Sequence, residues 1–274
     1  MSRLSGGSPR SARLGAVRRT HLLALAIASS AAFGVVLGAL PTDAQDEAPD
    51  TRTWRERASE GDIPCNAQEP QFFLVRAHWQ TKRWMERDEI RDRRGVHQQA
   101  VRYRTENYGY FEPFGSPGMN ASNPMSNAVG LRLFDRPIRL NRRIVEAARC
   151  AEMEIARTCE DDYAPRRLSG IRDRNTYHNG EVSNHVYGIA VDLDPRENTC
   201  CNCVKEWRLH PLCQATPESI FERMVMPECW VRGFEKYGFY WLGHDRLMDT
   251  MHFEFLGDPE HILVSDGPVP APQD

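Results

Sequence analysis

The run that most constrains this chain is residues 183–192, with the sequence SNHVYGIAVD. From Gly188 it alternates small or acidic residues with aliphatic residues, the period-2 pattern of a β-strand. We expect Gly188, Ala190 and Asp192 on one face of this strand, with the aliphatic side chains on the other. Two small side chains beside a carboxylate leave an open trough, so the pattern indicates a site rather than an ordinary core strand.

A second run, residues 249–255, has the sequence DTMHFEF and the same strand spacing. His252 and Glu254 share one face, whereas Met251 and the two phenylalanines share the other. A lone histidine is more often an ordinary polar residue than a ligand. However, His185, Asp192 and His252 together form the nitrogen, nitrogen and oxygen set of an open catalytic zinc site. The two runs therefore predict a metal site.

The motifs S-x-H-x-x-G-x-A-x-D and D-x-x-H-F-E resemble those of the zinc D-alanyl-D-alanine carboxypeptidase and L-alanyl-D-glutamate endopeptidase family, which acts on bacterial cell-wall peptides. The resemblance is clear over residues 168–256 and faint over 140–156. It implies one Zn²⁺ ion held by His185, Asp192 and His252, and a catalytic carboxylate at Asp249. Met251 precedes His252 where the carboxypeptidase branch usually has Trp and the endopeptidase branch Pro, so the resemblance implies either activity.

Arg172 closes an S-G-x-R motif at residues 169–172. The resemblance implies that this arginine binds the substrate or stabilises its developing oxyanion. A planar guanidinium suits either group, because it forms two parallel hydrogen bonds with a carboxylate or an oxyanion. The alternative is a structural salt bridge from Arg172 to Asp173 or Glu181.

The predicted mechanism follows from the charges of the site. Zinc lowers the pKa of a bound water to about 7. We expect Asp249 to accept the proton of that water and to deliver it to the leaving amine. Ser183 and Glu254 are expected to support the ligands, with Glu254 orienting a ligand imidazole.

The N-terminal part of the 274-residue chain predicts export. Five arginines and no acidic residue fall within residues 1–20, and an uncharged apolar run follows at 22–40. We interpret residues 1–44 as an export signal or a membrane anchor, because the run is long for a signal and near the length of a spanning helix. Either interpretation predicts a periplasmic, cell-envelope or secreted protein, with possible membrane attachment through residues 22–40.

The remaining organisation is one large domain. Residues 45–62 are rich in acidic residues, Ala and Pro and predict a linker. Residues 63–264 form the predicted peptidase domain, with a family-like core at about 140–257, and 265–274 are expected to be a disordered tail. A hydrophobic content of 41% is enough for a substantial core, and a net charge of -3 gives no reason to expect nucleic acid as a partner.

Eight cysteines form the second constraint on the fold. An even count in an exported chain favours disulfides, although eight cysteines allow 105 pairings. We expect disulfides to staple the insert 194–230 and thereby to fix the distance between Asp192 and His252. A structural zinc site made by the later cysteines is the alternative. The cysteines are Cys65, Cys150, Cys159, Cys200, Cys201, Cys203, Cys213 and Cys229.

Local patterns predict the other elements. Apolar and small residues recur at helical spacing over 141–159, with Asn141 as the N-cap. Residues 231–240 predict a short helix that ends in a turn at Gly238, and residues 100–110 resemble a strand. The predicted fold class is α+β: a small, largely antiparallel sheet carries the zinc site, helices pack on one side, and disulfides staple an insert.

Taken together, the sequence predicts an exported zinc metallopeptidase whose substrates are peptidoglycan stem peptides. Its activity would be that of a D-Ala-D-Ala carboxypeptidase or, alternatively, of an L-Ala-D-Glu-type endopeptidase. A non-catalytic, metal-containing module that binds the cell wall is a third possibility, and a structural, disulfide-rich envelope protein is a fourth. Nothing in the sequence indicates an oligomeric state.

Overall fold

The computed structural model describes residues 50–76, 93–177 and 181–264. All of them belong to the unit Asp50–Asp274. The predicted export segment 1–44 and the predicted tail 265–274 lie outside the described residues. Among the described residues, no helix has both the length and the apolar character needed to cross a membrane.

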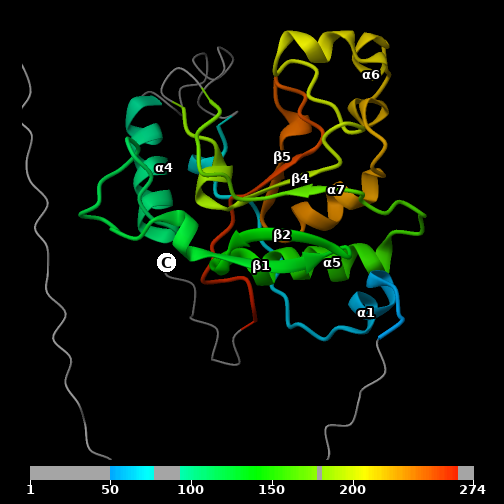
Figure 1. Ribbon diagram of the computed structural model, residues 1–274, viewed down its shortest axis with the longest axis horizontal. Coiled ribbons are helices and arrows are strands. Elements are labelled where there is room, and N and C mark those ends of the chain that lie inside the picture. The colour runs from blue at the N-terminus through cyan, green and yellow to red at the C-terminus, as the bar shows by residue number, and fades with distance from the viewer. Residues whose placement is uncertain (1–49, 77–92, 178–180, 265–274) are drawn as a thin grey trace, which may run out of the picture. The chain divides into compact units, whose positions relative to one another are not determined.

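Strands β4 and β5 belong to the sheet at the centre of the fold (Figure 1). This sheet has four antiparallel strands in the order β3–β4–β6–β5. A separate hairpin joins β1 to β2 through a turn at Phe134 and Asp135, both with positive φ. Backbone hydrogen bonds from Ile171 to Arg139 and from Asn141 to Gly188 attach this hairpin to the residues around the larger sheet. The strands are β1 (Ala128–Leu133), β2 (Arg136–Asn141), β3 (Leu168–Ser169), β4 (Ala190–Leu193), β5 (Phe239–Trp241) and β6 (His252–Phe255).

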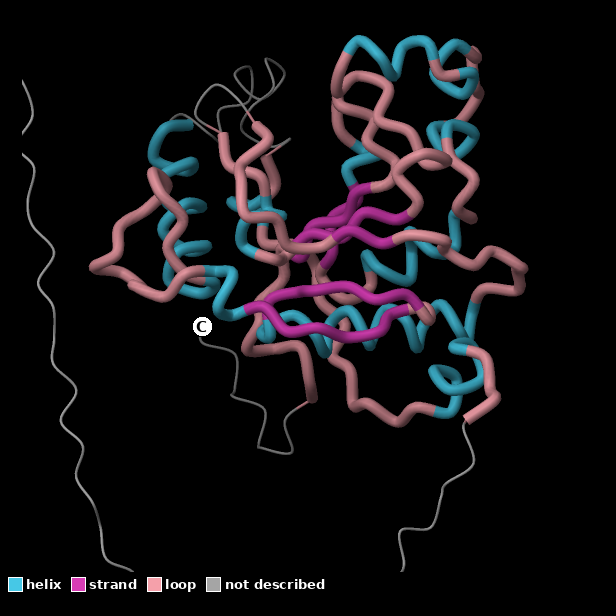
Figure 2. Tube along the Cα trace, viewed as in Figure 1, coloured by secondary structure: helices cyan, strands magenta, loops and turns pink. Residues whose placement is uncertain are grey.

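Short helices and long loops surround the strands, and much of the described chain is loop (Figure 2). The α-helices are α1 (Trp54–Glu60), α4 (Arg93–Tyr108), α5 (Val145–Thr158), α6 (Pro211–Gln214) and α7 (Glu228–Glu235). The 3₁₀ helices are η1 (Phe72–Leu74), η2 (Pro124–Asn127), η3 (Arg142–Ile144), η4 (Asn184–Tyr187), η5 (Lys205–Leu209), η6 (Ile220–Arg223) and η7 (Leu242–His244). The predicted α+β class is confirmed.

The apolar face of the sheet packs against α7, which in turn packs against α5. Phe234 of α7 stacks on Phe253 of β6 with ring centroids 4.4 Å apart, and it meets Phe239 of β5 edge to face. These rings are fully buried. The helices therefore cover one side of the sheet, and the polar residues of β4 and β6 occupy the other.

All eight cysteines form disulfides, so the disulfide interpretation is confirmed and the alternative cysteine zinc site loses its thiolates. Two bridges lie within the predicted insert, and a third ties the start of α7 to the end of α5. The fourth joins Cys65, which follows α1, to α5. The pairs are Cys65–Cys150, Cys159–Cys229, Cys200–Cys203 and Cys201–Cys213.

The strand predicted at 100–110 is wrong, because residues 100–108 belong to helix α4. The buried positions Ala100, Arg104 and Tyr108 recur every four residues, which is helical spacing. The helical spacing was not recognised in the sequence, because the buried residue between Ala100 and Tyr108 is the charged Arg104.

The structure also differs from the predicted linker at 45–62, because α1 forms within it. Thr53 and Glu56 make a reciprocal capping box at its N-terminus. Trp54 is buried and meets Phe134 and Trp230 edge to face, with ring centroids 5.0 and 5.6 Å apart. Helix α1 is therefore part of the folded unit.

Replacing Trp54 by Ala tests this boundary. We expect the free energy of unfolding to fall by about 3–5 kcal/mol, because a large aromatic side chain leaves a cavity in the core. Chemical denaturation of the purified protein measures the change. Leu209→Ala is the control, since an exposed side chain should change stability by less than about 0.5 kcal/mol. A similarly small effect at Trp54 would show that the segment is a linker after all.

Candidate functional site

Three side chains meet on the polar face of the sheet. Asp192 of β4 lies directly opposite His252 of β6, and His185 approaches from η4. His252 Nδ1 lies 2.7 Å from Asp192 Oδ1, and His185 Nε2 lies 3.1 Å from each of these atoms. The three residues are at most 3% exposed. The structure thus brings together the three residues that the sequence predicted as ligands.

The position of His185 depends on a short 3₁₀ helix rather than on a strand. Ser183 caps η4 by accepting the backbone N–H of His185 at 3.4 Å. Gly188 ends η4 with φ +71°, and a Cβ there would lie 2.9 Å from the backbone nitrogen of Asn141. Asn141 also donates from Nδ2 to the carbonyl of Tyr187 at 3.1 Å. The strand therefore begins at Ala190, two residues later than the alternation predicted.

Each imidazole has an inner nitrogen that faces the cluster and an outer nitrogen that faces away from it, and a contact at the outer nitrogen orients the ring. His185 Nδ1 lies 2.6 Å from the carbonyl oxygen of Gly170, and His252 Nε2 lies 3.1 Å from Glu254 Oε1. An oxygen acceptor at each outer nitrogen favours the tautomer whose inner nitrogen is an electron-pair donor. His185 Nε2 and His252 Nδ1 are these inner nitrogens.

The electrostatic field at the site favours positive charge. Burial opposes the ionised form of Asp192, but the two histidines hold the pKa of this carboxyl well below its ordinary value. Burial likewise opposes a charged His252, but Asp192 and Glu254 raise its pKa well above the ordinary value. Burial lowers the pKa of His185, which leaves this ring neutral. One neutral imidazole, one carboxylate and one imidazole held between carboxylates suit a bound cation.

The donor set also fits a metal ion. One atom each from His185, Asp192 and His252 lies within 4.8 Å of the others, so the three side chains could hold an ion. Two imidazole nitrogens and one carboxylate oxygen, with their outer atoms fixed, are the donors expected of a catalytic zinc site.

Arg172 lies at the edge of the same cluster. Its Nη2 donates to Asp192 Oδ2 at 2.5 Å and lies 3.1 Å from His185 Nε2. The side chain is 35% exposed, so it joins the buried ligands to the solvent side of the site. Arg172 forms its ion pair with Asp192. The alternative interpretation of the sequence was a structural salt bridge to Asp173 or Glu181.

Asp249 occupies the turn before β6 and is 9% exposed. Its Oδ1 atom is buried and has no hydrogen-bond partner among the described residues. Burial raises the pKa of Asp249 to about 7. The negative charges of Asp192 and Glu254 also raise this pKa, whereas the charge of His252 lowers it. A carboxyl with this pKa can both accept and release a proton near neutral pH.

The start of the insert holds this turn in place. Cys200 forms a β-bridge with Asp249, and the carbonyl of Thr199 accepts the backbone N–H of Thr250 at 2.7 Å. Cys203 Sγ, which is bonded to Cys200, lies 3.7 Å from Asp249 Oδ2. The prediction that the insert fixes Asp192 against His252 needs correction, because β4–β6 pairing does so directly. The insert contacts Asp249 instead.

Residues 177–255 match the family model described as D-alanyl-D-alanine carboxypeptidase. The predicted family resemblance is confirmed. No curated protein and no solved structure matches the chain. The match supports a cell-wall peptidase in general, and the family segment contains the three candidate ligands and Asp249.

Sequence reasoning missed Arg76, which lies outside the family segment. Its Nη2 donates to Glu254 Oε1 at 2.8 Å, and both side chains are almost fully buried. The guanidinium also lies over the ring of Tyr177, 4.4 Å from the centroid, and donates to its hydroxyl at 2.9 Å. Despite burial, Arg76 and His252 lower the pKa of Glu254 to about 2. Arg76 thus keeps Glu254 ionised, and the Glu254 carboxylate contacts the outer nitrogen of His252.

We expect Arg76→Met to destabilise the fold by about 3–5 kcal/mol, because it leaves a buried carboxylate without its guanidinium. Urea denaturation measures the loss. The matched control is the double variant Arg76→Met with Glu254→Gln, which removes both charges and should recover part of that stability. Equal losses in the single and double variants would contradict the argument.

Proposed function

We propose that the protein is a zinc-dependent peptidase that hydrolyses peptidoglycan stem peptides, with the activity of a D-Ala-D-Ala carboxypeptidase. The observation that carries the proposal is the convergence of His185 Nε2, Asp192 Oδ1 and His252 Nδ1, with both outer nitrogens held by oxygen acceptors. The family match over residues 177–255 supports the reaction class.

These three atoms would hold the zinc ion. When bound, zinc lowers the pKa of water to about 7 and polarises the substrate carbonyl. Asp249 accepts a proton from the attacking water through its unpartnered, buried Oδ1 and returns it to the leaving amine. Glu254 holds the ring of His252, and the carbonyl of Gly170 holds the ring of His185.

We base the proposed choice between the two activities of the family on Arg172. A carboxypeptidase substrate ends in a carboxylate beside the cleaved bond, whereas an endopeptidase substrate has a continuing peptide there. A partly exposed guanidinium at the edge of the ligand cluster is suited to that terminal carboxylate. It supports the carboxypeptidase assignment over L-Ala-D-Glu cleavage.

We also propose that the protein acts outside the cytoplasm, after export through residues 1–44. Four disulfides support this location, because disulfides persist in oxidising compartments. The alternative of a non-catalytic binding module leaves Asp249 without a role, since a purely binding site has no need of a buried carboxyl beside its ligands.

Asp249→Asn is the decisive variant. We expect it to bind one zinc ion per chain, like the wild type, and to lose roughly 10²–10⁴-fold in kcat, because Asn cannot accept the proton. Zinc content and the product masses from a panel of stem peptides measure the two properties. His252→Ala is the companion variant and should lose the zinc.

The products also decide among the alternatives. Release of a terminal D-Ala supports the carboxypeptidase, and cleavage after L-Ala would transfer the assignment to the endopeptidase. Zinc binding by the wild type without cleavage of any peptide would instead establish a binding module. A wild type that binds no zinc at His185, Asp192 and His252 would end the catalytic proposal.

A further prediction concerns the disulfide beside Asp249. Replacing Cys200 and Cys203 by Ser should lower kcat by roughly tenfold or more, because small misplacements of a reacting group are costly. Bound zinc should be unchanged, since β4 and β6 carry the ligands. The matched control replaces Cys201 and Cys213, the neighbouring bridge in the insert. Equal losses in the two variants would mean that the bridge supports the insert in general rather than Asp249.

A further inference from the structure

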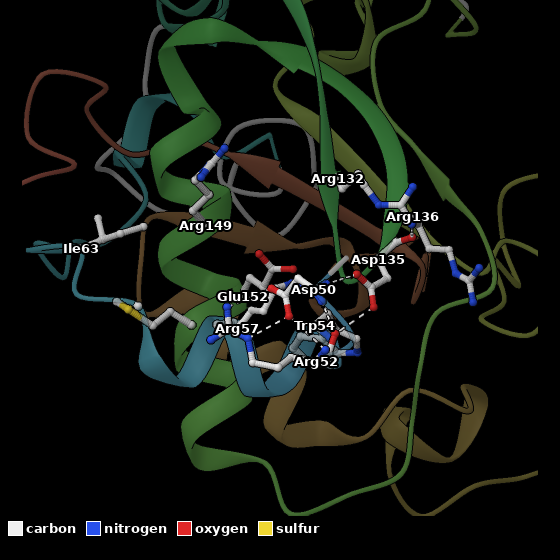
Figure 3. Close-up of a pocket in the computed structure, with 13 residues that line it drawn as sticks. Asp50, Arg52, Trp54, Arg57, Ile63, Arg132, Asp135, Arg136, Arg149 and Glu152 are labelled. Carbon is white, nitrogen blue, oxygen red and sulfur yellow. Dashed lines mark hydrogen bonds and ion pairs between the residues drawn. The ribbon is translucent and has the colours of Figure 1, made fainter. Parts of the chain in front are cut away.

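A cavity of the described residues is lined by charged side chains (Figure 3). Its volume is about 970 Å³. Helix α1 with the residues before it, the tip of the β1–β2 hairpin and the middle of α5 form its walls. None of the strands β3–β6 contributes a residue, so this cavity is separate from the proposed peptidase chemistry.

The charged lining is unbalanced. The three carboxylates of the cavity already have donors: Asp50 pairs with Arg52, Asp135 pairs with Arg57, and Glu152 accepts the backbone N–H of Phe134. The lining contains three carboxylates and five arginines, namely Asp50, Asp135, Glu152, Arg52, Arg57, Arg132, Arg136 and Arg149.

Three of these arginines remain without a carboxylate partner in the part of the chain that the structure describes. Arg132 donates to the carbonyl of Asp135, and Arg136 donates to the carbonyl of Pro165 at 2.7 Å. The side chain of Arg149 makes no hydrogen bond or ion pair with a described residue, although its charge acts on the carboxyl of Glu152. All three are exposed at the cavity. Their positive charges are therefore available to a ligand.

The arrangement of these groups limits the shape of that ligand. Arg149 extends from α5 on one side of the view, whereas Arg132 and Arg136 lie on the hairpin at the other (Figure 3). The lining also includes the buried side chains of Trp54 and Met153. The positive charges therefore come from two different walls of the cavity. A chain with anionic groups at intervals can contact both and lie over the apolar lining.

We propose that this cavity binds a soluble oligoanion with repeated phosphate groups. A phosphate presents oxygens in several directions, so it can accept hydrogen bonds from arginines on different elements. A membrane surface fits less well, because the arginines line a hollow and the side chains of Trp54 and Met153 in its lining are buried. The proposal does not depend on the proposed peptidase activity.

Glu152 gives the site a pH dependence. Burial raises the pKa of Glu152 to about 7, and the nearby charge of Asp135 raises it further. The backbone hydrogen bond from Phe134 and the charges of Arg149 and Arg57 lower the pKa, but by less. The carboxyl therefore loses its negative charge as the pH falls through about 7. An oligoanion should bind more tightly at pH 6 than at pH 8, and Glu152→Gln should reduce that difference.

The test is calorimetric titration of the purified full-length chain with a linear polyphosphate of about ten phosphates. We expect Arg149→Ser and the double variant Arg132→Ser with Arg136→Ser each to weaken binding by roughly tenfold or more, since charge-assisted hydrogen bonds are lost. Inorganic phosphate should bind far more weakly than the polymer. Arg208→Ser, an exposed arginine of the insert, is the matched control and should bind as the wild type does.

Several outcomes would overturn the proposal. These are no binding of polyphosphate by the wild type, unchanged binding by the cavity variants, or an equal loss in Arg208→Ser. Arginine-dependent binding to phosphatidylglycerol vesicles without binding of polyphosphate would assign the cavity to a membrane surface instead. Equal unfolding midpoints of the variants and the wild type establish that a loss of binding is not a loss of fold.

Discussion

The antiparallel pairing of β4 with β6 is the interaction on which the site depends. It sets Asp192 opposite His252 and Ala190 opposite Glu254, so the ligands and the residue that orients one of them share a face. Because side chains alternate along a strand, the same register places Val191 and Phe253 against the helices. A slip of one residue would exchange the two faces. The packing of α7 on the apolar side therefore enforces the geometry of the polar side.

This dependence explains why the ligands could be predicted from the sequence. Alternation with period 2 is visible in Ala190–Leu193 and in His252–Phe255, and each run encodes its own two faces. The small residue Ala190 and the Gly188 turn mark the polar face of the sheet. Local patterns of this kind need no knowledge of distant contacts, so the α+β class and the shared polar face of Asp192 and His252 followed from them. His185 lies on a 3₁₀ helix and was predicted from its donor chemistry and its motif instead.

What could not be predicted depends on contacts between distant residues or on a misleading local pattern. The hydrogen bond from Arg76 to Glu254 joins residues that are 178 positions apart, and no repeating pattern in the sequence connects the two. Helix α4 has a buried arginine where its apolar stripe should continue, so it resembled a strand. Cysteine pairing is also a property of the folded chain. The sequence indicated that the insert matters to the site, but not that it contacts Asp249 rather than setting the distance between β4 and β6.

The Arg76 contact has a consequence for the extent of the functional unit. The family segment, residues 177–255, contains His252 and Glu254 but not the cation that pairs with Glu254. A carboxylate that is only 1% exposed needs a partner to stay ionised, because burial alone would raise its pKa and neutralise it. A neutral Glu254 would no longer attract the outer N–H of His252 as strongly, so the ring would lose part of its orientation. Arg76 is therefore as much a part of the site as the strands that carry the ligands.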